Sequence, residues 1–231
     1  MNKVYITDIN NLKKWFSYEE LYNKASSYRK QKVDKLKFEK DKFLSLGVDY
    51  LFRCALKDIG IEYSNAEIDF KSNNKPIIKN YDGIFFNLSH SEEIAMCVIS
   101  NNEVGCDVQK MSADFLDIAD RFFCQSEIDL ITCKETFEEK RDMFYRLWTL
   151  KESYMKALGL GFKLGLSEFQ IYYENNTAKV WSNKNLDTNF YFEEIKLENQ
   201  NYKCSICSKS FAKCEVKEIL NNFLNDDKRA I

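Results

Sequence analysis

The order of helical and strand-like segments is the feature that most constrains how this chain can fold. A charged stretch with helical periodicity covers residues 17–57, with an interruption before Lys37. Segments typical of strands lie before it at 3–9 and after it at 61–70, 84–88, 94–100 and 104–109. The order then recurs, with helical patterns at 113–121, 126–133 and 137–158 and strand patterns at 169–173, 179–181, 189–196 and 202–207. Helices followed by strands, twice, predict an α+β fold with two related halves.

No linker separates these halves. The 231 residues include only seven glycines and one proline, and no Pro- or Ser-rich segment interrupts them. We therefore expect the two halves to pack directly on each other. The strand patterns at 94–100 and 104–109 are expected to be joined by a turn at Asn101 and Asn102, as in a hairpin.

Charge, hydropathy and cysteines exclude several classes of protein. Thirty-four Lys and Arg against 36 Asp and Glu give a net charge of -2, too balanced for a generic nucleic-acid binder. No apolar run reaches the length of a membrane span, and the start MNKVYITDIN lacks a signal-peptide pattern, so a cytoplasmic location is expected. There the eight cysteines should be reduced thiols. Cys204 and Cys207 have metal-like spacing, but their alternating neighbours favour a strand.

The segment VGCDVQ, residues 104–109, carries the first candidate site residues. Its apolar residues face one side of the predicted strand, which places Asp107 and Gln109 on the other side, about 7 Å apart. Polar residues on one face of a strand are commonly only solvated. A site here therefore needs a second element to supply further groups.

The helix FYRLWTLKESYMKALG, residues 144–159, carries the second set. Its core-facing residues follow the 3.6-residue period, while Trp148, Glu152 and Lys156 lie near the opposite side. A Glu–Lys pair at i,i+4 is commonly a solvated surface pair. Tyr145 and Trp148 share that side, however, and large aromatic residues indicate that a second surface covers it. Glu152 and Lys156 are therefore expected in a cleft.

The segment FNLSHS, residues 86–91, is the third candidate. Ser89 and His90 are not a catalytic pair, because adjacent residues of a strand point to opposite faces. His90 is the only histidine of the chain, which excludes a site that needs two. A lone histidine is commonly structural, although at the end of a strand it is also placed to donate to a phosphate. The residues leave both interpretations open.

Taken in order, these segments resemble the Sfp-type 4′-phosphopantetheinyl transferases, over most of the chain. The matching pieces are Asn74-Lys75-Pro76 for the family's Gly-Lys-Pro, FNLSHS at 86–91, VGCDVQ at 104–109, RFFCQSE at 121–127 and LWTLKESYMKALGLG at 147–161. The Trp-x-x-Lys-Glu-x-x-x-Lys element at 148–156 is the most specific of them. The resemblance implies a monomer of two pseudo-symmetric α+β subdomains with the active site in the cleft between them. We expect subdomains at 1–103 and 104–221 and a polar tail at 222–231.

The resemblance also implies a reaction. The enzyme would transfer the phosphopantetheine arm of coenzyme A to a serine of an acyl or peptidyl carrier protein and release adenosine 3′,5′-bisphosphate. The catalytic residues would be Asp107, Glu152 as proton acceptor, and Lys156 at the pyrophosphate. Mg²⁺ or Mn²⁺ would be held by Asp107, Gln109 and Glu152. Contacts with coenzyme A would come from Lys32, Lys75, Pro76, Ser89, His90 and Lys156.

Two positions depart from the family pattern. The family often has Glu where this chain has Gln109, whose amide oxygen can bind Mg²⁺ but brings no charge. Leu44 lies near the position of an arginine that clamps the phosphates of coenzyme A. The cluster RKQKVDKLK at 29–37 is expected to bind these phosphates instead, through Lys32 and Lys35. A lysine-rich helix face is, however, commonly just solvated.

The sequence also offers a candidate surface for a partner protein and leaves two other functions open. The segment 111–124, with Phe115, Leu116, Phe122 and Phe123, is a candidate docking surface for the carrier, and a buried helix explains it equally well. No nucleic-acid or membrane partner is expected. One rival is a non-catalytic module that binds coenzyme A or a carrier protein. Another is an unrelated metal-dependent phosphoryl-transfer enzyme or phosphatase that uses Asp107 and Glu152.

Overall fold

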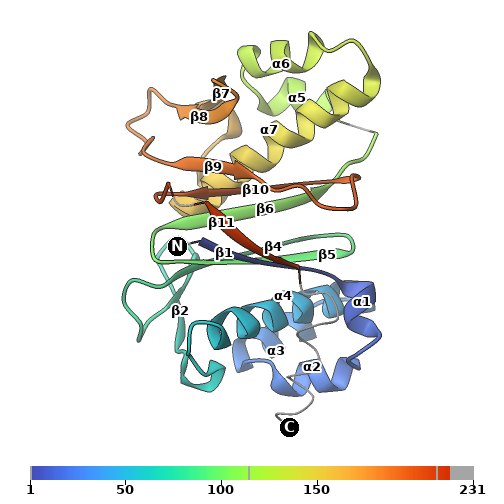
Figure 1. Cartoon of the computed structure of the whole chain (residues 1–231), viewed down its shortest axis with the longest axis vertical. Coiled ribbons are helices and arrows are strands. Elements are labelled where there is room, and N and C mark those ends of the chain that lie inside the picture. The colour runs from blue at the N-terminus through green and yellow to red at the C-terminus, as the bar shows by residue number, and fades with distance from the viewer. Residues whose placement is uncertain (1, 114, 212, 219–231) are drawn as a thin grey trace.

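The computed structural model describes residues 2–113, 115–211 and 213–218. It has four layers, in which two sheets lie between a first and a second layer of helices (Figure 1). The first helical layer consists of α1 (Ile9–Lys13), α2 (Tyr18–Lys24), α3 (Ser27–Asp34) and α4 (Glu39–Lys57). The second consists of α5 (Leu116–Phe122), α6 (Gln125–Thr132) and α7 (Phe137–Leu158). None of the helices in the described ranges combines the length and apolar character that crossing a bilayer requires.

The two main sheets lie between the helical layers. The first has the order β11-β1-β5-β4, from β11 (Cys214–Glu218), β1 (Asn2–Asp8), β5 (Ile94–Ser100) and β4 (Phe85–Ser91). The second has the order β6-β10-β9, from β6 (Val104–Lys110), β10 (Tyr202–Ser208) and β9 (Tyr191–Glu194). Two small hairpins flank them, β2 (Ile68–Phe70) with β3 (Pro76–Ile78) and β7 (Gln170–Glu174) with β8 (Thr177–Trp181).

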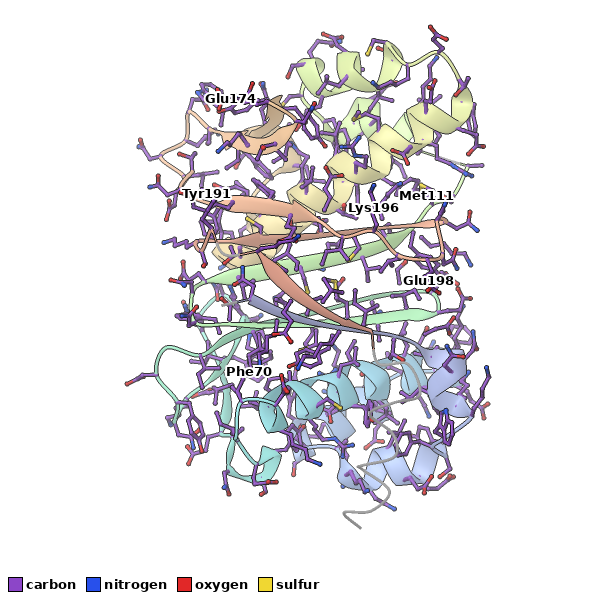
Figure 2. All side chains as sticks on the ribbon, viewed as in Figure 1. Phe70, Met111, Glu174, Tyr191, Lys196 and Glu198 are labelled. Atoms are coloured by element: carbon purple, nitrogen blue, oxygen red, sulfur yellow. The ribbon has the colours of Figure 1, made fainter. Side chains whose placement is uncertain are left out.

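Side chains fill the spaces between these layers (Figure 2). The buried apolar ones form three cores. The first joins α4 to the outer face of the first sheet, and includes Leu51 and Cys97. The second joins α7 to α5, α6 and the outer face of the second sheet. The third lies between the sheets, where Val98 of β5 and Val108 of β6 belong to one cluster. Alternate residues of each strand thus supply different cores, as the pleat requires.

The α+β fold is confirmed, and most of the expected helices and strands are present. The expected hairpin between residues 94–100 and 104–109 is wrong, because β5 pairs with β4 and β1 whereas β6 pairs with β10. Both edges of β5 are already occupied, so the chain crosses to the other sheet at residues 101–103. The strand expected at 61–70 is reduced to β2, since Tyr63–Asn65 forms a short 3₁₀ helix.

The last described strand returns to the first sheet. β11 runs parallel to β1, with Val216 opposite Val4. Lys217 of β11 and Lys3 of β1 both form ion pairs with Asp58 at the end of α4. Their Nζ atoms lie 2.8 and 2.7 Å from Asp58 Oδ2. The range 104–221 expected for the second subdomain therefore includes a strand that pairs with the first sheet, while the expected tail at 222–231 lies outside the described residues.

Candidate active site

The site begins with an unusually close approach of α7 to β6. The helix starts at a capping box between Thr136 and Glu139 and ends at Gly159, whose φ of 72° lies in the left-handed region. Between these ends α7 crosses Gly105 of β6. A Cβ atom at Gly105 would lie 2.1 Å from the carbonyl oxygen of Ser153. Only glycine permits this packing, and it brings the face of β6 that carries Asp107 directly against α7.

Asp107 lies at the centre of a cluster contributed by three elements. Its Oδ1 accepts hydrogen bonds from Lys156 Nζ of α7 at 2.6 Å and from Ser89 Oγ of β4 at 2.9 Å. Lys156 Nζ also donates to Ser89 Oγ at 3.1 Å. Within the described chain, the other oxygen of Asp107, Oδ2, is buried and has no hydrogen-bond partner. The structure therefore brings together three residues that the sequence analysis singled out and leaves one carboxylate oxygen available for a further ligand.

Glu152 and Lys156 share the electrostatics of this cluster. Burial raises the pKa of half-buried Glu152, and the negative charge of Asp107 raises it further, while Lys156 opposes this. Burial lowers the pKa of Lys156, but the ion pair with Asp107 and other negative groups outweigh it, so the net shift is upward. Lys156 is therefore charged at neutral pH, and Glu152 is a stronger base than an ordinary carboxylate.

A second surface covers the Glu152 side of α7, as the aromatic residues predicted. Tyr145 is buried, and the ring of half-buried Trp148 lies 5.8 Å from that of Phe144 and 6.3 Å from that of Phe123, which follows α5. The expectation that a purely solvated face would not carry both aromatic residues is confirmed. Phe123, directly after α5, therefore packs against the Trp148 side of α7.

The donor set of the cluster suits a hard divalent cation. Asp107 Oδ2 lacks a partner in the described residues, Glu152 is electrostatically coupled to Asp107, and Gln109 lies two residues further on the same face of β6. Across the described ranges, no three His, Cys, Asp or Glu side chains are grouped as a metal site. Two carboxylates and an amide oxygen nevertheless match the oxygen ligands that Mg²⁺ prefers, with water completing its shell. The residues present therefore fit this ion.

A separate cavity of about 230 Å³ lies on the N-terminal side of the cluster. Lys32, Pro76 and His90 line it together with Arg29 and the aromatic side chain of Tyr28. Partial loss of hydration, followed by the positive charges of Lys32, Lys156 and Arg29, lowers the pKa of His90 to about 4, although His90 is an exposed residue. Partial loss of hydration, followed by the charge of Arg29, also lowers the pKa of Lys32, which is exposed as well. The cavity is thus a positively charged site beside an uncharged imidazole.

Arg29 is a residue that the sequence reasoning missed. Its buried side chain donates from Nε to Asp49 at 3.2 Å and from a terminal nitrogen to Ser45 at 3.2 Å, so its orientation in the cavity wall is fixed. The signal was present in the sequence, since Arg29 and Lys32 are three residues apart and share a face of α3. Lys35, the other expected phosphate contact, follows the last residue of α3 and does not line the cavity.

Lys75 and Leu44 occupy structural positions. The Lys75 ammonium is buried and donates to the carbonyl oxygens of Ala157 at 2.6 Å and Val104 at 3.1 Å. Burial lowers its pKa to about 8. Lys75 therefore ties the end of α7 and the start of β6 to the segment before β3, and its contact with a phosphate stays a prediction. Leu44 is buried in the first apolar core, in agreement with its not serving as a phosphate clamp.

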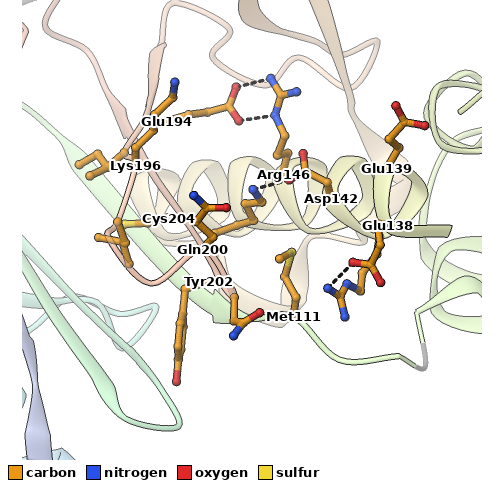
Figure 3. A pocket seen from close by; sticks show the side chains of 15 residues that line it. Met111, Glu138, Glu139, Asp142, Arg146, Glu194, Lys196, Gln200, Tyr202 and Cys204 are labelled. Carbon is orange, nitrogen blue, oxygen red and sulfur yellow. Dashed lines mark hydrogen bonds and ion pairs between the residues drawn. The ribbon is translucent and has the colours of Figure 1, made fainter. Parts of the chain in front are cut away.

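A further cavity of about 850 Å³, larger than the one lined by Lys32 and His90, is lined by none of the expected site residues (Figure 3). It lies between the first half of α7 and the segment joining β9 to β10. Most of its charged side chains neutralise one another: Arg146 binds both carboxylate oxygens of Glu194, at 2.6 and 2.9 Å, and Lys203 pairs with Asp142. Its size alone therefore does not mark it as the catalytic site.

An acidic pair and a charged lysine between β6 and α7, with a basic cavity on the N-terminal side, suit chemistry on phosphate groups. Comparison with known proteins gives the same class. The family model described as the 4′-phosphopantetheinyl transferase superfamily matches residues 103–207. The chain is 34% identical over 196 residues to 4′-phosphopantetheinyl transferase gsp of Aneurinibacillus migulanus, covering 80% of each chain. It therefore belongs to the 4′-phosphopantetheinyl transferase family and is an enzyme of that class.

Two further relatives show how far the likeness extends. The 4′-phosphopantetheinyl transferase Sfp of Bacillus subtilis (strain 168) is 29% identical over 154 residues, which cover 66% of this chain and 68% of that protein. The L-aminoadipate-semialdehyde dehydrogenase-phosphopantetheinyl transferase of Xenopus laevis is 27% identical over 195 residues, covering 75% of this chain and 65% of that protein. The Sfp-type family assignment made from the sequence motifs is confirmed.

Proposed function

We propose that this enzyme transfers the 4′-phosphopantetheine arm of coenzyme A to a serine of an apo acyl or peptidyl carrier protein. The serine oxygen forms a bond to the β-phosphate of coenzyme A, the pyrophosphate bond breaks, and adenosine 3′,5′-bisphosphate leaves. The observation that carries the proposal is the cluster of Asp107, Lys156 and Ser89 beside Glu152. It supplies what the reaction needs, a base for the serine proton and a positive charge at the pyrophosphate.

Glu152 is the group that accepts the serine proton. Its pKa is raised by burial and by Asp107, which increases its basicity relative to an exposed glutamate. Lys156, one helical turn further along α7, neutralises charge on the pyrophosphate and on the leaving group. Its ion pair with Asp107 fixes the position of the ammonium before the substrate arrives.

Asp107, Glu152 and Gln109 would hold Mg²⁺. The unpartnered Oδ2 of Asp107 in the described structure supports this assignment. When bound, the cation supplies further neutralisation of the pyrophosphate charge. Since Gln109 contributes no charge, the site should bind Mg²⁺ more weakly than a site with three carboxylates.

The positive cavity would hold the nucleotide end of coenzyme A. Lys32 and His90 supply donors for the 3′-phosphate, Pro76 and Tyr28 supply apolar walls, and Arg29 adds positive charge. Ser89 stands between this cavity and the Asp107 cluster, because it is adjacent to His90 and bonded to Asp107. The two halves of the coenzyme would thus be held by different subdomains.

The carrier protein would dock beside α5. Of the four apolar residues expected there, Phe115 and Phe123 are buried in the second core, whereas Leu116 and Phe122 are 43% and 45% exposed. The exposed pair supplies the apolar part of a docking surface.

We also propose that the enzyme acts as a monomer in the cytoplasm, where its eight free thiols stay reduced.

Mass spectrometry of apo carrier proteins mixed with the enzyme, coenzyme A and Mg²⁺ tests the proposal. Transfer adds about 340 Da, the mass of the phosphopantetheine arm, to the carrier. Glu152→Gln keeps the shape of the side chain but removes its charge and basicity, so the rate should fall at least about 100-fold. The matched control is Glu174→Gln, at an exposed residue at the end of β7. Free phosphopantetheine with unmodified carrier, or an unchanged rate in Glu152→Gln, would contradict the proposal.

A further inference from the structure

The second sheet is joined to the first by side chains rather than by a backbone ladder. β4 and β6 are the facing edge strands of the two sheets. Three side chains of β4 accept hydrogen bonds from three backbone N–H groups of β6. The contacts are Cys106 N to Asn87 Oδ1 at 3.0 Å, Val108 N to Ser89 Oγ at 3.3 Å and Lys110 N to Ser91 Oγ at 3.0 Å. We call these three acceptors the β4 acceptor row.

The acceptor row satisfies groups that would otherwise be orphaned. Successive N–H groups of a strand point to opposite sides within the plane of the sheet, so every second one on β6 points away from β10. Residues 104–108 of β6 are buried, and a buried N–H group without a partner is strongly unfavourable. The accepting side chains of Asn87, Ser89 and Ser91 are buried as well. The row therefore acts as a substitute for a neighbouring strand.

The spacing of the row fixes the register between the subdomains. Each acceptor lies 19 residues before its donor, so β4 and β6 run in parallel with one constant offset. A slip of one residue would bring Leu88 and His90 to the positions of the acceptors, and a leucine cannot accept a hydrogen bond. This register is what holds Ser89 opposite Asp107.

Both ends of β6 carry further contacts to the first subdomain. At the start, Lys75 Nζ donates to the carbonyl oxygen of Val104. At the end, Lys110 Nζ pairs with Glu93 at 3.1 Å, in the turn between β4 and β5. The acceptor row spans the stretch between these two contacts, and Ser91 is the member whose partner on β6, Lys110, lies furthest from Asp107.

We propose that Ser91 is a positioning residue for the transfer reaction: its hydroxyl locks β6 in register with β4 and thereby sets the place of Asp107 relative to Ser89 and His90. This inference rests on the proposed function for its catalytic consequence, but the register itself is independent of activity. Ser91 is distinct from the catalytic groups, since its hydroxyl binds Lys110 N and not Asp107. It would act through the strand that carries them.

Native-state hydrogen exchange and kinetics together test the role of Ser91. In the parent protein the amides of Cys106, Val108 and Lys110 should be protected like those of a paired strand. Ser91→Ala should raise exchange at Lys110 and Val108, lower kcat about fivefold and leave KM for coenzyme A within about twofold. Ser91→Thr retains the hydroxyl and should restore both. The half-saturating Mg²⁺ concentration should rise in Ser91→Ala, because Asp107 is displaced.

Ser100→Ala is the matched control. Ser100 is also a buried serine of the first sheet, but its hydroxyl binds Asn2 and the amide of Asn102 within the same subdomain. This variant should melt at a lower temperature while keeping kcat and the Mg²⁺ dependence of the parent.

Equal kinetics in Ser91→Ala and Ser100→Ala would overturn the proposal. So would rapid exchange of the Cys106, Val108 and Lys110 amides in the parent, a result that needs no variant to fold. A parent protein without transferase activity would instead refute the proposed function, and the exchange data would still decide the register.

Discussion

Replacing Gly105 with alanine tests whether the contact between α7 and β6 creates the active site. The new Cβ would lie 2.1 Å from the carbonyl oxygen of Ser153 and 2.3 Å from the backbone nitrogen of Ala157. Neither is a flexible side-chain atom, so the helix itself must move. Since an ordinary contact begins at 3.4 Å, the displacement is roughly 1.3 Å at the closest point.

A shift of this size has two separate consequences. It breaks the 2.6 Å ion pair between Lys156 and Asp107 and moves Glu152 with the helix, and misplacement by about 1 Å typically costs about 100-fold in rate. Overpacking in a core also costs about 1–3 kcal/mol of folding free energy. For a chain of this size the melting temperature should fall by roughly 2–12 °C.

Gly47→Ala is the control for Gly105→Ala. Gly47 lies inside α4, and the nearest atom to its added Cβ is a side-chain methyl of Ile9 at 3.2 Å, which needs to move by only a few tenths of an ångström. Alanine also favours a helix by about 0.5–1 kcal/mol over glycine. We expect Gly47→Ala to melt within a few degrees of the parent and to modify the carrier at the parent rate. If Gly105→Ala is active within threefold of the parent in the mass-spectrometric assay, the contact does not set the site and the reasoning is refuted.

Three further predictions follow from the charges. Gln109→Glu adds a negative charge beside Asp107 and should lower the Mg²⁺ concentration at half-maximal rate; an unchanged metal titration would remove Gln109 from the site. His90→Ala should raise KM for coenzyme A by roughly 10- to 150-fold with little effect on kcat, and should reduce the discrimination against dephospho-coenzyme A; full discrimination would return His90 to a structural role. Glu93 accepts hydrogen bonds from Tyr202, Lys110 and Lys40, which lower its pKa from 4.5 to about 2. Its stabilising contribution is therefore complete above pH 4.5 and is lost as the pH falls towards 2, so denaturant unfolding of Glu93→Gln should show a flatter pH dependence in that window than the parent.

Local periodicity predicted the elements that carry the site better than it predicted their partners. The expected helix at 137–158 coincides with α7, because capping residues and the 3.6-residue period act within one segment. β4, β5, β6 and β10 were also expected, but periodicity assigns a strand its faces and not its neighbours. The wrong hairpin between β5 and β6 is the result. The grouping of Asp107, Glu152 and Lys156 came from the family resemblance and not from periodicity.

Non-local contacts explain the other omissions. β11 alternates Cys214 and Val216 with charged residues over only five positions, and its partner β1 lies at the other end of the chain. Lys75 looks like a phosphate ligand in the sequence, and only the fold shows the carbonyl groups of Val104 and Ala157 that its ammonium meets. The acceptors on β4 look like ordinary polar strand residues until β6 is placed beside them.

The pairing of β11 with β1 imposes an order on folding during synthesis. β11 is made about 200 residues after β1, which takes roughly 10–40 s at ordinary translation rates. Once β5 is made and pairs with one side of β1, the other side stays an open edge until β11 arrives, and open edges invite pairing with other chains. Lys3 on β1 and the late arrival Lys217 then meet on Asp58, which fastens the closing strand. A nascent chain that stalls before residue 214 therefore exposes this edge to aggregation even when its active-site segments are complete.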